Sequence, residues 1–160
     1  MVFDRGDSEM ARNEKIKTSK RVIIDASVIT RWYLNEEWTN KALQLRHDYE
    51  QGKIMLIAPY LIFYEVGNAL RYSKDLTQQD VVASLNSLIK LQIKLIYIDK
   101  NLIDKMSEIA FLNNITIYDS SYCAIAELLS CRFITGDERL KEKVNHPYFC
   151  SLKNYDYDMI

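Results

Sequence analysis

The sequence predicts an α/β fold, a three-layer α/β/α sandwich in which helices cover both faces of a central parallel sheet. Short apolar runs with strand character alternate with longer segments of helical periodicity along most of the chain, which is typical of parallel sheets. The first run, 22–24, is branched and apolar at every position, as expected of a strand buried on both faces. Asp25 follows it directly and should lie at the carboxyl edge of the sheet, where open α/β sheets bind ligands.

Length and composition are those of a single globular domain. A domain near 160 residues buries roughly 68–70% of its unfolded surface, which is enough for a core without disulfides. Apolar residues make up 48% of the chain and charged residues 27%, an ordinary balance. The net charge of -1 provides no global basic field, so a nucleic-acid partner would have to be held by local groups.

The number of cysteines and the length of the apolar runs argue against a disulfide-rich, zinc-binding or membrane-spanning protein. Three cysteines without a C-x-x-C pair argue against a disulfide framework or a zinc site. No apolar run approaches the roughly 18 residues of a membrane span, and the N-terminus has no apolar signal core. We therefore expect a cytoplasmic protein without membrane contact. Residues 1–20 are polar, so we expect a tail there and a single domain over 21–160.

The first half of the chain alternates helix and strand after Asp25. Gly52 is typical of a helix stop, Pro59 of a first helical position, and Thr77 of an N-cap. Together with the apolar spacing, these signals predict a strand over 54–58 and helices over 28–34, 39–51, 60–72 and 77–91.

The second half continues the alternation. We expect strands over 94–98, 133–134 and 148–152, an extended piece over 115–118, and helices over 101–112, 120–131 and 138–144. The helix over 120–131 is apolar almost all round, which indicates burial. Asp99, at the end of the third strand, is interpreted as the cap of the next helix.

The helix over 60–72 carries an acid within its apolar stripe. Glu65 lies four residues from both Leu61 and Ala69, and the stripe also includes Ile62 and Tyr72. A buried charge without a partner is very costly, so the fold must supply Glu65 with one.

Four acids each occur where an apolar element ends or where an apolar stripe would otherwise continue. They are Asp25, Glu65, Asp119 and Asp137. Each has a structural explanation when taken alone. The aspartates could cap the turns or helices that follow them, and Glu65 could meet a buried arginine. Taken together they suggest a shared site, because the predicted sheet can bring them to one edge.

Electrostatics determine what such a site requires. Two carboxylates about 4 Å apart repel by about 4 kcal/mol at an effective dielectric of 20. Several such pairs would offset much of a total stability of about 5–15 kcal/mol, so the group must hold protons or a cation. Oxygen ligands without Cys or His favour Mg²⁺ or Mn²⁺, which can activate water and polarise a phosphodiester.

Four segments, IIDAS, YEVGNAL, YDSSYCAIAE and FITGDERL, occur in the order found in a known family. Through them the chain resembles PIN-domain ribonucleases, and most closely the VapC-like toxins of type II (VapBC) toxin–antitoxin pairs. The resemblance extends from residue 21 to about residue 152. It implies a PIN domain over 21–160 with a parallel sheet of strand order 3-2-1-4-5.

The resemblance also assigns roles to individual residues. Asp25, Glu65, Asp119 and Asp137 match the catalytic and metal-binding acids of the family, with Mg²⁺ or Mn²⁺ as the implied cofactor. Asp25 and Asp119 are the implied direct ligands. Three neutral residues match supporting positions beside the acids, namely Ser27, Asn68 and Thr135.

The implied function is that of a Mg²⁺-dependent endoribonuclease, the toxin of a toxin–antitoxin pair. Its implied partners are an RNA substrate, a cognate antitoxin and a second copy of the chain in a homodimer. Tyr60, Phe63 and Tyr64, on the helix that carries Glu65, could contribute to a hydrophobic groove for the antitoxin. The RNA target and the number of metal ions are not encoded in any motif.

Two alternatives stay open at this stage. A catalytically silent PIN-like module could bind RNA or protein without cutting, which would suit the near-neutral net charge. A haloacid-dehalogenase-like phosphatase would use a similar sheet, but such enzymes carry a second aspartate two residues after the first. Here Ser27 occupies that position.

Overall fold

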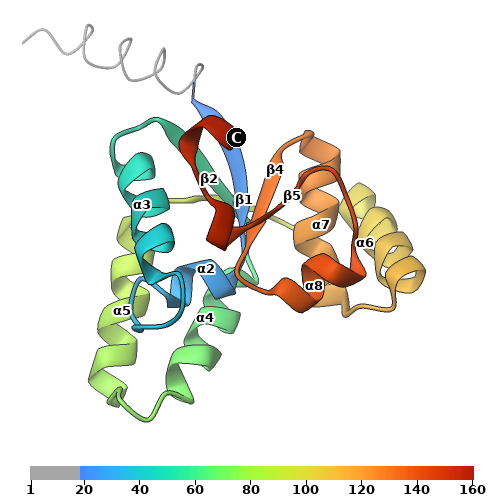
Figure 1. Cartoon of the computed structure of the whole chain (residues 1–160). Helices are drawn as coiled ribbons and strands as arrows, with labels where there is room; N and C mark the ends of the chain where they lie inside the picture. Colours follow the sequence, from blue (N-terminus) through green and yellow to red (C-terminus); the bar gives the residue numbers. More distant parts are fainter. Residues whose placement is uncertain (1–18) are drawn as a thin grey trace, which may run out of the picture.

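The computed structural model describes residues 19–160 and contains a five-stranded parallel sheet (Figure 1). The strand order is β3-β2-β1-β4-β5, so the predicted fold class and strand order are confirmed. The strands are β1 (Lys20–Ile24), β2 (Ile54–Pro59), β3 (Lys94–Ile96), β4 (Arg132–Thr135) and β5 (Phe149–Ser151).

Helices cover both faces of this sheet (Figure 1). Helix α3 packs on β2 from one side, whereas α7 packs on β1, β2 and β4 and is covered in turn by α6. The helices are α2 (Ala26–Thr30), α3 (Thr39–Glu50), α4 (Ile62–Arg71), α5 (Gln78–Lys90), α6 (Lys100–Asn113), α7 (Ile117–Leu129) and α8 (Glu138–Lys143). Two 3₁₀ turns, η1 (Leu152–Asn154) and η2 (Tyr157–Met159), end the chain.

Strand β1 is the centre of the sheet and pairs with β2 on one side and β4 on the other. Its apolar residues 22–24 are fully buried, as the run predicted. Ile24 is opposite Ile134 in the register, so the residues that follow, Asp25 and Thr135, emerge side by side at the carboxyl edge. The strand order reverses between β1 and β4, which makes this edge a topological switch point.

Helix α7 begins earlier than the sequence predicted. The prediction of an extended piece over 115–118 is wrong, because Ile117 is already the first residue of the helix. Thr116 is the N-cap, and its hydroxyl accepts a 3.0 Å hydrogen bond from the Asp119 N–H. This cap outweighs the strand preference of the branched residues around it, and it places Asp119 in the first turn of the helix.

The start and the apolar face of α4 also differ from the prediction. Pro59 does not open the helix; it is the last residue of β2, paired with β3. The buried positions are Ile62, Val66 and Leu70, four residues apart, whereas Tyr72 is 72% exposed. The face that packs is therefore rotated from the predicted stripe, and Glu65 lies at its border, half-buried.

The C-terminal segment is held against α3 by a buried phenol. Tyr155 is 2% exposed, and its hydroxyl donates a 2.9 Å hydrogen bond to Asp48 Oδ2. Lys53 Nζ lies 2.9 Å from the other oxygen of the same carboxylate. Asp48 is therefore a buried acid whose charge is compensated by Lys53, the residue that precedes β2.

The expected tail, residues 1–20, falls almost entirely outside the described residues. Its last member, Lys20, is the first residue of β1. Within residues 19–160, no helix combines the length and the apolar character that crossing a membrane requires.

Candidate functional site

The carboxylate of Asp25 lies buried at the end of β1 and is held at both oxygens. Ser27 Oγ donates a hydrogen bond to Oδ1, and Thr135 Oγ1 donates one to Oδ2. The donor–acceptor distance is 2.5 Å in both. The Val28 N–H adds a 3.3 Å bond to Oδ1, which makes Asp25 the N-cap of α2. A carboxylate has about four acceptor positions, and the donors among residues 19–160 fill three of them, which leaves one on Oδ2 for a further ligand.

The two hydroxyls also fasten the turn that follows β4. Ser27 Oγ accepts a 2.7 Å hydrogen bond from the Gly136 N–H, and Thr135 Oγ1 accepts a 2.9 Å bond from the Asp137 N–H. Each hydroxyl has one proton, and both protons are directed to Asp25. Asp25 and the turn after β4 are thus joined into one rigid unit, which keeps Asp137 beside Asp25.

Gly136 leaves room in this unit for an arginine. A Cβ atom at Gly136 would lie 2.6 Å from Arg31 Nη1 and 3.1 Å from Ser27 Oγ, so a side chain would disturb both. The Arg31 guanidinium donates to the backbone carbonyls of Ser27 and Glu37. Arg31 therefore fixes the backbone around Ser27.

Glu65 reaches the same edge of the sheet from α4 and finds its partner on α7. The hydroxyl of Tyr122 donates a hydrogen bond to Glu65 Oε2. Tyr122 is 2% exposed, and its ring stacks on Phe133 with 5.9 Å between centroids. No local pattern in the sequence indicates this bond, because the two residues are 57 positions apart.

Asp119 and Asp137 stand at the starts of α7 and α8. Asp119 is half-buried, and its Oδ2 accepts a 2.8 Å hydrogen bond from Thr116 Oγ1. Asp137 is exposed and caps α8, where Oδ1 accepts from the backbone of Arg139 at 2.9 Å and Leu140 at 3.1 Å. The remaining predicted residue, Asn68, is exposed on α4, three positions beyond Glu65.

Charge interactions connect the four acids, since Asp25 interacts with Asp137, and Glu65 interacts with both Asp25 and Asp119. Burial raises the pKa of Asp25 to about 6; the hydrogen bonds from Ser27, Thr135 and Val28 oppose this shift, and the charge of Asp137 adds to it. Burial also raises the pKa of Glu65, with a hydrogen bond from Tyr122 opposing and the charges of Asp25 and Asp119 adding. Among residues 19–160, every charge that shifts the pKa of Glu65 is a carboxylate.

A hard divalent cation fits the donor chemistry of this group. All the candidate ligands are oxygens, and the charges of Asp25 and Asp119 both oppose ionisation of Glu65. Within the described part of the chain, no three Asp, Glu, His or Cys side chains form a ready-made metal-binding group. Mg²⁺ suits such an open arrangement, because proteins usually bind it through one or two carboxylates while water and substrate phosphates complete its shell.

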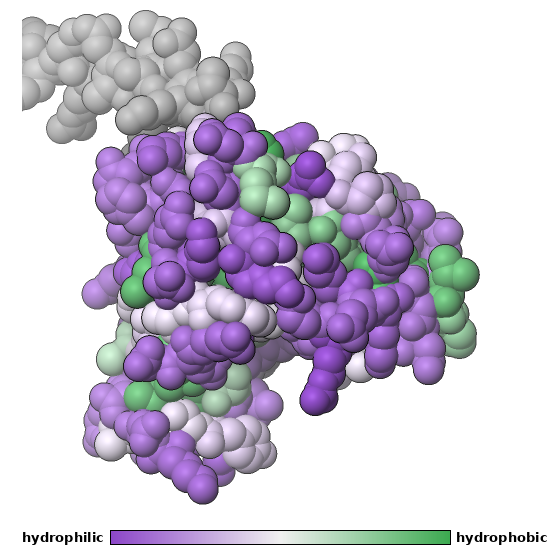
Figure 2. Space-filling view, in the orientation of Figure 1, coloured by the Kyte–Doolittle hydropathy of each residue, from purple (hydrophilic) through white to green (hydrophobic). Residues whose placement is uncertain are grey.

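The elements that carry the acids border a hollow in the surface. Figure 2 shows a notch at the lower edge of the view, between the lobe that contains α4 and α5 and the lobe that contains α8. In the same view the carboxyl end of β1 lies between these two lobes (Figure 1).

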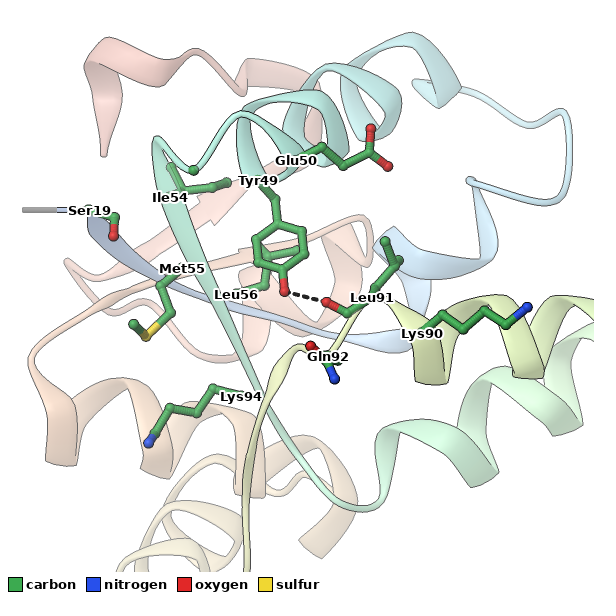
Figure 3. Close-up of a pocket in the computed structure, with 11 residues that line it drawn as sticks. Ser19, Tyr49, Glu50, Ile54, Met55, Leu56, Lys90, Leu91, Gln92 and Lys94 are labelled. Atoms are coloured by element: carbon green, nitrogen blue, oxygen red, sulfur yellow. Dashed lines mark hydrogen bonds between the residues drawn. The ribbon is translucent and has the colours of Figure 1, made fainter. Parts of the chain in front are cut away.

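A different pocket lies at the opposite, amino-terminal edge of β2 and β3 (Figure 3). Tyr49 lies across it and donates a 2.5 Å hydrogen bond to the carbonyl of Leu91. Lys90, Lys94 and Glu50 are its charged lining residues. Two lysines beside its single acid would repel a divalent cation, so this pocket is not the candidate site.

Exposed aromatic residues form a continuous surface next to the acids, which we call the aromatic surface. Two grooves share Tyr60 and Tyr97, whose rings stack with 5.3 Å between centroids. Both rings follow the carboxyl ends of their strands, β2 and β3. The other members of this surface are Phe63, Tyr64, Ile98, Ile117 and Tyr118. An exposed apolar area of this kind indicates an interaction surface.

Comparison with known proteins yields one family and a set of solved structures. The PIN domain family model matches residues 22–145. No curated protein matches the chain.

The similar solved structures share the fold at low sequence identity. PAE2754 from Pyrobaculum aerophilum is 24% identical with a TM-score of 0.60, covering 84% of this chain and 90% of its own. VapC20 from Mycobacterium tuberculosis, described as a sarcin-ricin loop cleaving toxin, is 9% identical with a TM-score of 0.59, covering 76% and 93%. A toxin–antitoxin complex from Klebsiella pneumoniae is 12% identical with a TM-score of 0.61, covering 82% and 97%.

Proposed function

The chain belongs to the PIN domain family, and on that premise we propose that it is a metal-dependent endoribonuclease that hydrolyses RNA phosphodiester bonds. The observation that carries the proposal is the position of Asp25. It lies buried at the switch point of the sheet, is held by Ser27 and Thr135, and interacts electrostatically with Glu65 and Asp137. Membership of this family also removes the phosphatase alternative.

Asp25 and Asp119 are the proposed direct ligands of Mg²⁺ or Mn²⁺, with Glu65 and Asp137 as further ligands or as acceptors that orient a water molecule. When bound, the cation would polarise the phosphodiester and lower the pKa of water. The residues of the chain orient the ligands and attract the cation. Ser27 and Thr135 keep Asp25 in one orientation, and the surrounding carboxylates attract the cation.

We propose further that the protein is the toxin of a toxin–antitoxin pair, with an antitoxin and a second copy of the chain as partners. Two observations support this part. VapC20 is described as a toxin, and the Klebsiella structure is a toxin–antitoxin complex. The aromatic surface offers an apolar area suited to a protein partner, and it includes Tyr60, Phe63 and Tyr64 of the predicted groove.

Cleavage of RNA tests the proposal. Purified protein should degrade RNA when Mg²⁺ or Mn²⁺ is present and stop when EDTA is added. Asp25→Asn should abolish the activity. Asp99→Asn is the matched control, because Asp99 also follows a strand and caps a helix but lies outside the group of acids. Equal cleavage by wild type and Asp25→Asn would refute the proposal.

A silent PIN-like module that binds RNA or protein without cutting is the second candidate. It is favoured by the near-neutral net charge and by the lack, within residues 19–160, of three grouped metal ligands. Titration with Mn²⁺ separates the two candidates. A nuclease should gain thermal stability from Mn²⁺ through Asp25, whereas a silent module need not.

A further inference from the structure

Tyr122 connects the two helices that carry Glu65 and Asp119. It lies three residues after Asp119 on α7, and its hydroxyl crosses to Glu65 on α4. The ring is held from the other side by Phe133 of β4, with the two ring planes only 8° apart. The phenol therefore has a fixed position, set by the sheet and not by Glu65.

Glu65 needs such an anchor more than an ordinary half-buried glutamate does. Its carboxylate interacts with the charges of Asp25 and Asp119, and both of these interactions are repulsive. The glutamate side chain has three rotatable bonds and borders solvent, so repulsion would turn it away from the other acids. The O–H of Tyr122 is the hydrogen bond that opposes this movement.

We propose that Tyr122 is a positioning residue that holds the carboxylate of Glu65 toward the divalent-cation site. The inference rests on the proposed function, because it assigns Tyr122 a role for that cation. A purely structural role is the alternative, since any buried phenol needs a hydrogen-bond partner. The two roles differ in what removal of the hydroxyl does to cation binding.

Tyr122→Phe tests the proposal, because it keeps the ring and removes only the hydroxyl. Mn²⁺ affinity, measured by calorimetry and by the loss of the free-ion electron paramagnetic resonance signal, should fall by about 10-fold or more. Tyr155→Phe is the matched control. Tyr155 is equally buried and also donates to a carboxylate, Asp48, but it lies away from the acids. It should lower thermal stability and leave Mn²⁺ affinity unchanged.

A double-mutant cycle shows whether Tyr122 acts through Glu65. In a Glu65→Gln background, Tyr122→Phe should have no further effect on Mn²⁺ affinity. An undiminished effect would overturn the proposal, because the phenol would then act by another route. Equal Mn²⁺ affinities of Tyr122→Phe and wild type would overturn it too, as would failure of Tyr122→Phe to fold, which would assign the hydroxyl to stability.

Wild type and Asp25→Asn separate this inference from the proposed function. If wild type binds Mn²⁺ and Asp25→Asn does not, a null result with Tyr122→Phe counts against the positioning role alone. If wild type fails to bind Mn²⁺, both the metal-dependent function and the role of Tyr122 are refuted.

Discussion

Thr135 Oγ1 donates a 2.5 Å hydrogen bond to Asp25 Oδ2 across two neighbouring parallel strands, 110 residues apart in the chain. The same oxygen of Thr135 accepts the N–H of Asp137. One hydroxyl thus positions the central carboxylate and a second acid together. The strand pairing of β1 with β4 makes this possible, because it brings the two strand ends to the same level.

Replacement of Thr135 by valine should separate stability from function at this hydroxyl. Thr135→Val keeps the shape but leaves the buried Asp25 with one donor fewer and the Asp137 N–H without its acceptor. We expect a loss of about 1–3 kcal/mol in the free energy of unfolding, measured with urea. RNA cleavage should fall by at least 10-fold in the folded variant. Unchanged cleavage would show that Thr135 is structural only.

The stability of the metal-free protein should decrease as the pH rises from about 4 to about 6. Burial raises the pKa of Asp25 from 3.8 to about 6, so over this range the unfolded chain releases a proton that the folded protein keeps. The contribution of protonated Asp25 to stability is fully present below pH 3.8 and is lost above about pH 6. It corresponds to about 3 kcal/mol, and the raised pKa of Glu65 acts in the same direction.

Urea denaturation in EDTA at pH 4.5 and pH 7.5 measures this dependence. Because asparagine does not titrate, Asp25→Asn should reduce the difference between the two conditions by about 2 kcal/mol, the part of the contribution that remains at pH 4.5. Parallel pH profiles of wild type and variant would mean that Asp25 titrates in the folded protein as it does in the unfolded chain.

Divalent cations should raise thermal stability at pH 7.5. Binding to the folded state alone adds about 2.7 kcal/mol when the free Mn²⁺ concentration is 100 times the dissociation constant. The melting temperature should rise with Mn²⁺ and return to its original value with EDTA. Asp25→Asn should remove the response, and Asp99→Asn should keep it. A rise of equal size in Asp25→Asn would place the bound cation elsewhere.

The aromatic surface should determine self-association. Tyr97 is 70% exposed and stacked on Tyr60, so Tyr97→Glu places a charge at the point shared by both grooves. If the protein forms the expected homodimer through this surface, light scattering after gel filtration should show the variant as a monomer. Tyr72→Glu is a control of similar exposure, 72%, outside the surface. Dimers of Tyr97→Glu would exclude this surface as the interface.

Local signals in the sequence predicted those features that depend on a few neighbouring residues. Thr77 forms a capping box with Asp80, and Asp99 caps α6, as their positions indicated. The fully apolar run 22–24 was sufficient to predict a strand buried on both faces. These features need only local hydrogen bonds or a burial pattern, so no knowledge of distant contacts was required.

The predictions from the sequence were wrong or incomplete where a distant contact or a competing helix cap determines the local structure. At Thr116 a hydroxyl cap overrides the strand preference of the next residue, which moved the start of α7. On α4 the partner helices α2 and α5 determine which face is buried, and periodicity alone selected Tyr72 wrongly. The bond from Tyr122 to Glu65 joins α7 to α4 across 57 positions of the chain, which no local pattern encodes.

The long separation between Asp25 and its hydroxyl donor also has a consequence for synthesis on the ribosome. A growing polypeptide that has not yet reached Thr135 lacks the donor to Asp25 and the turn that carries Asp137. If the protein is a toxic nuclease, the translating cell is protected from shorter products, because harmful activity would arise only after β4 and the turn that follows it have been made.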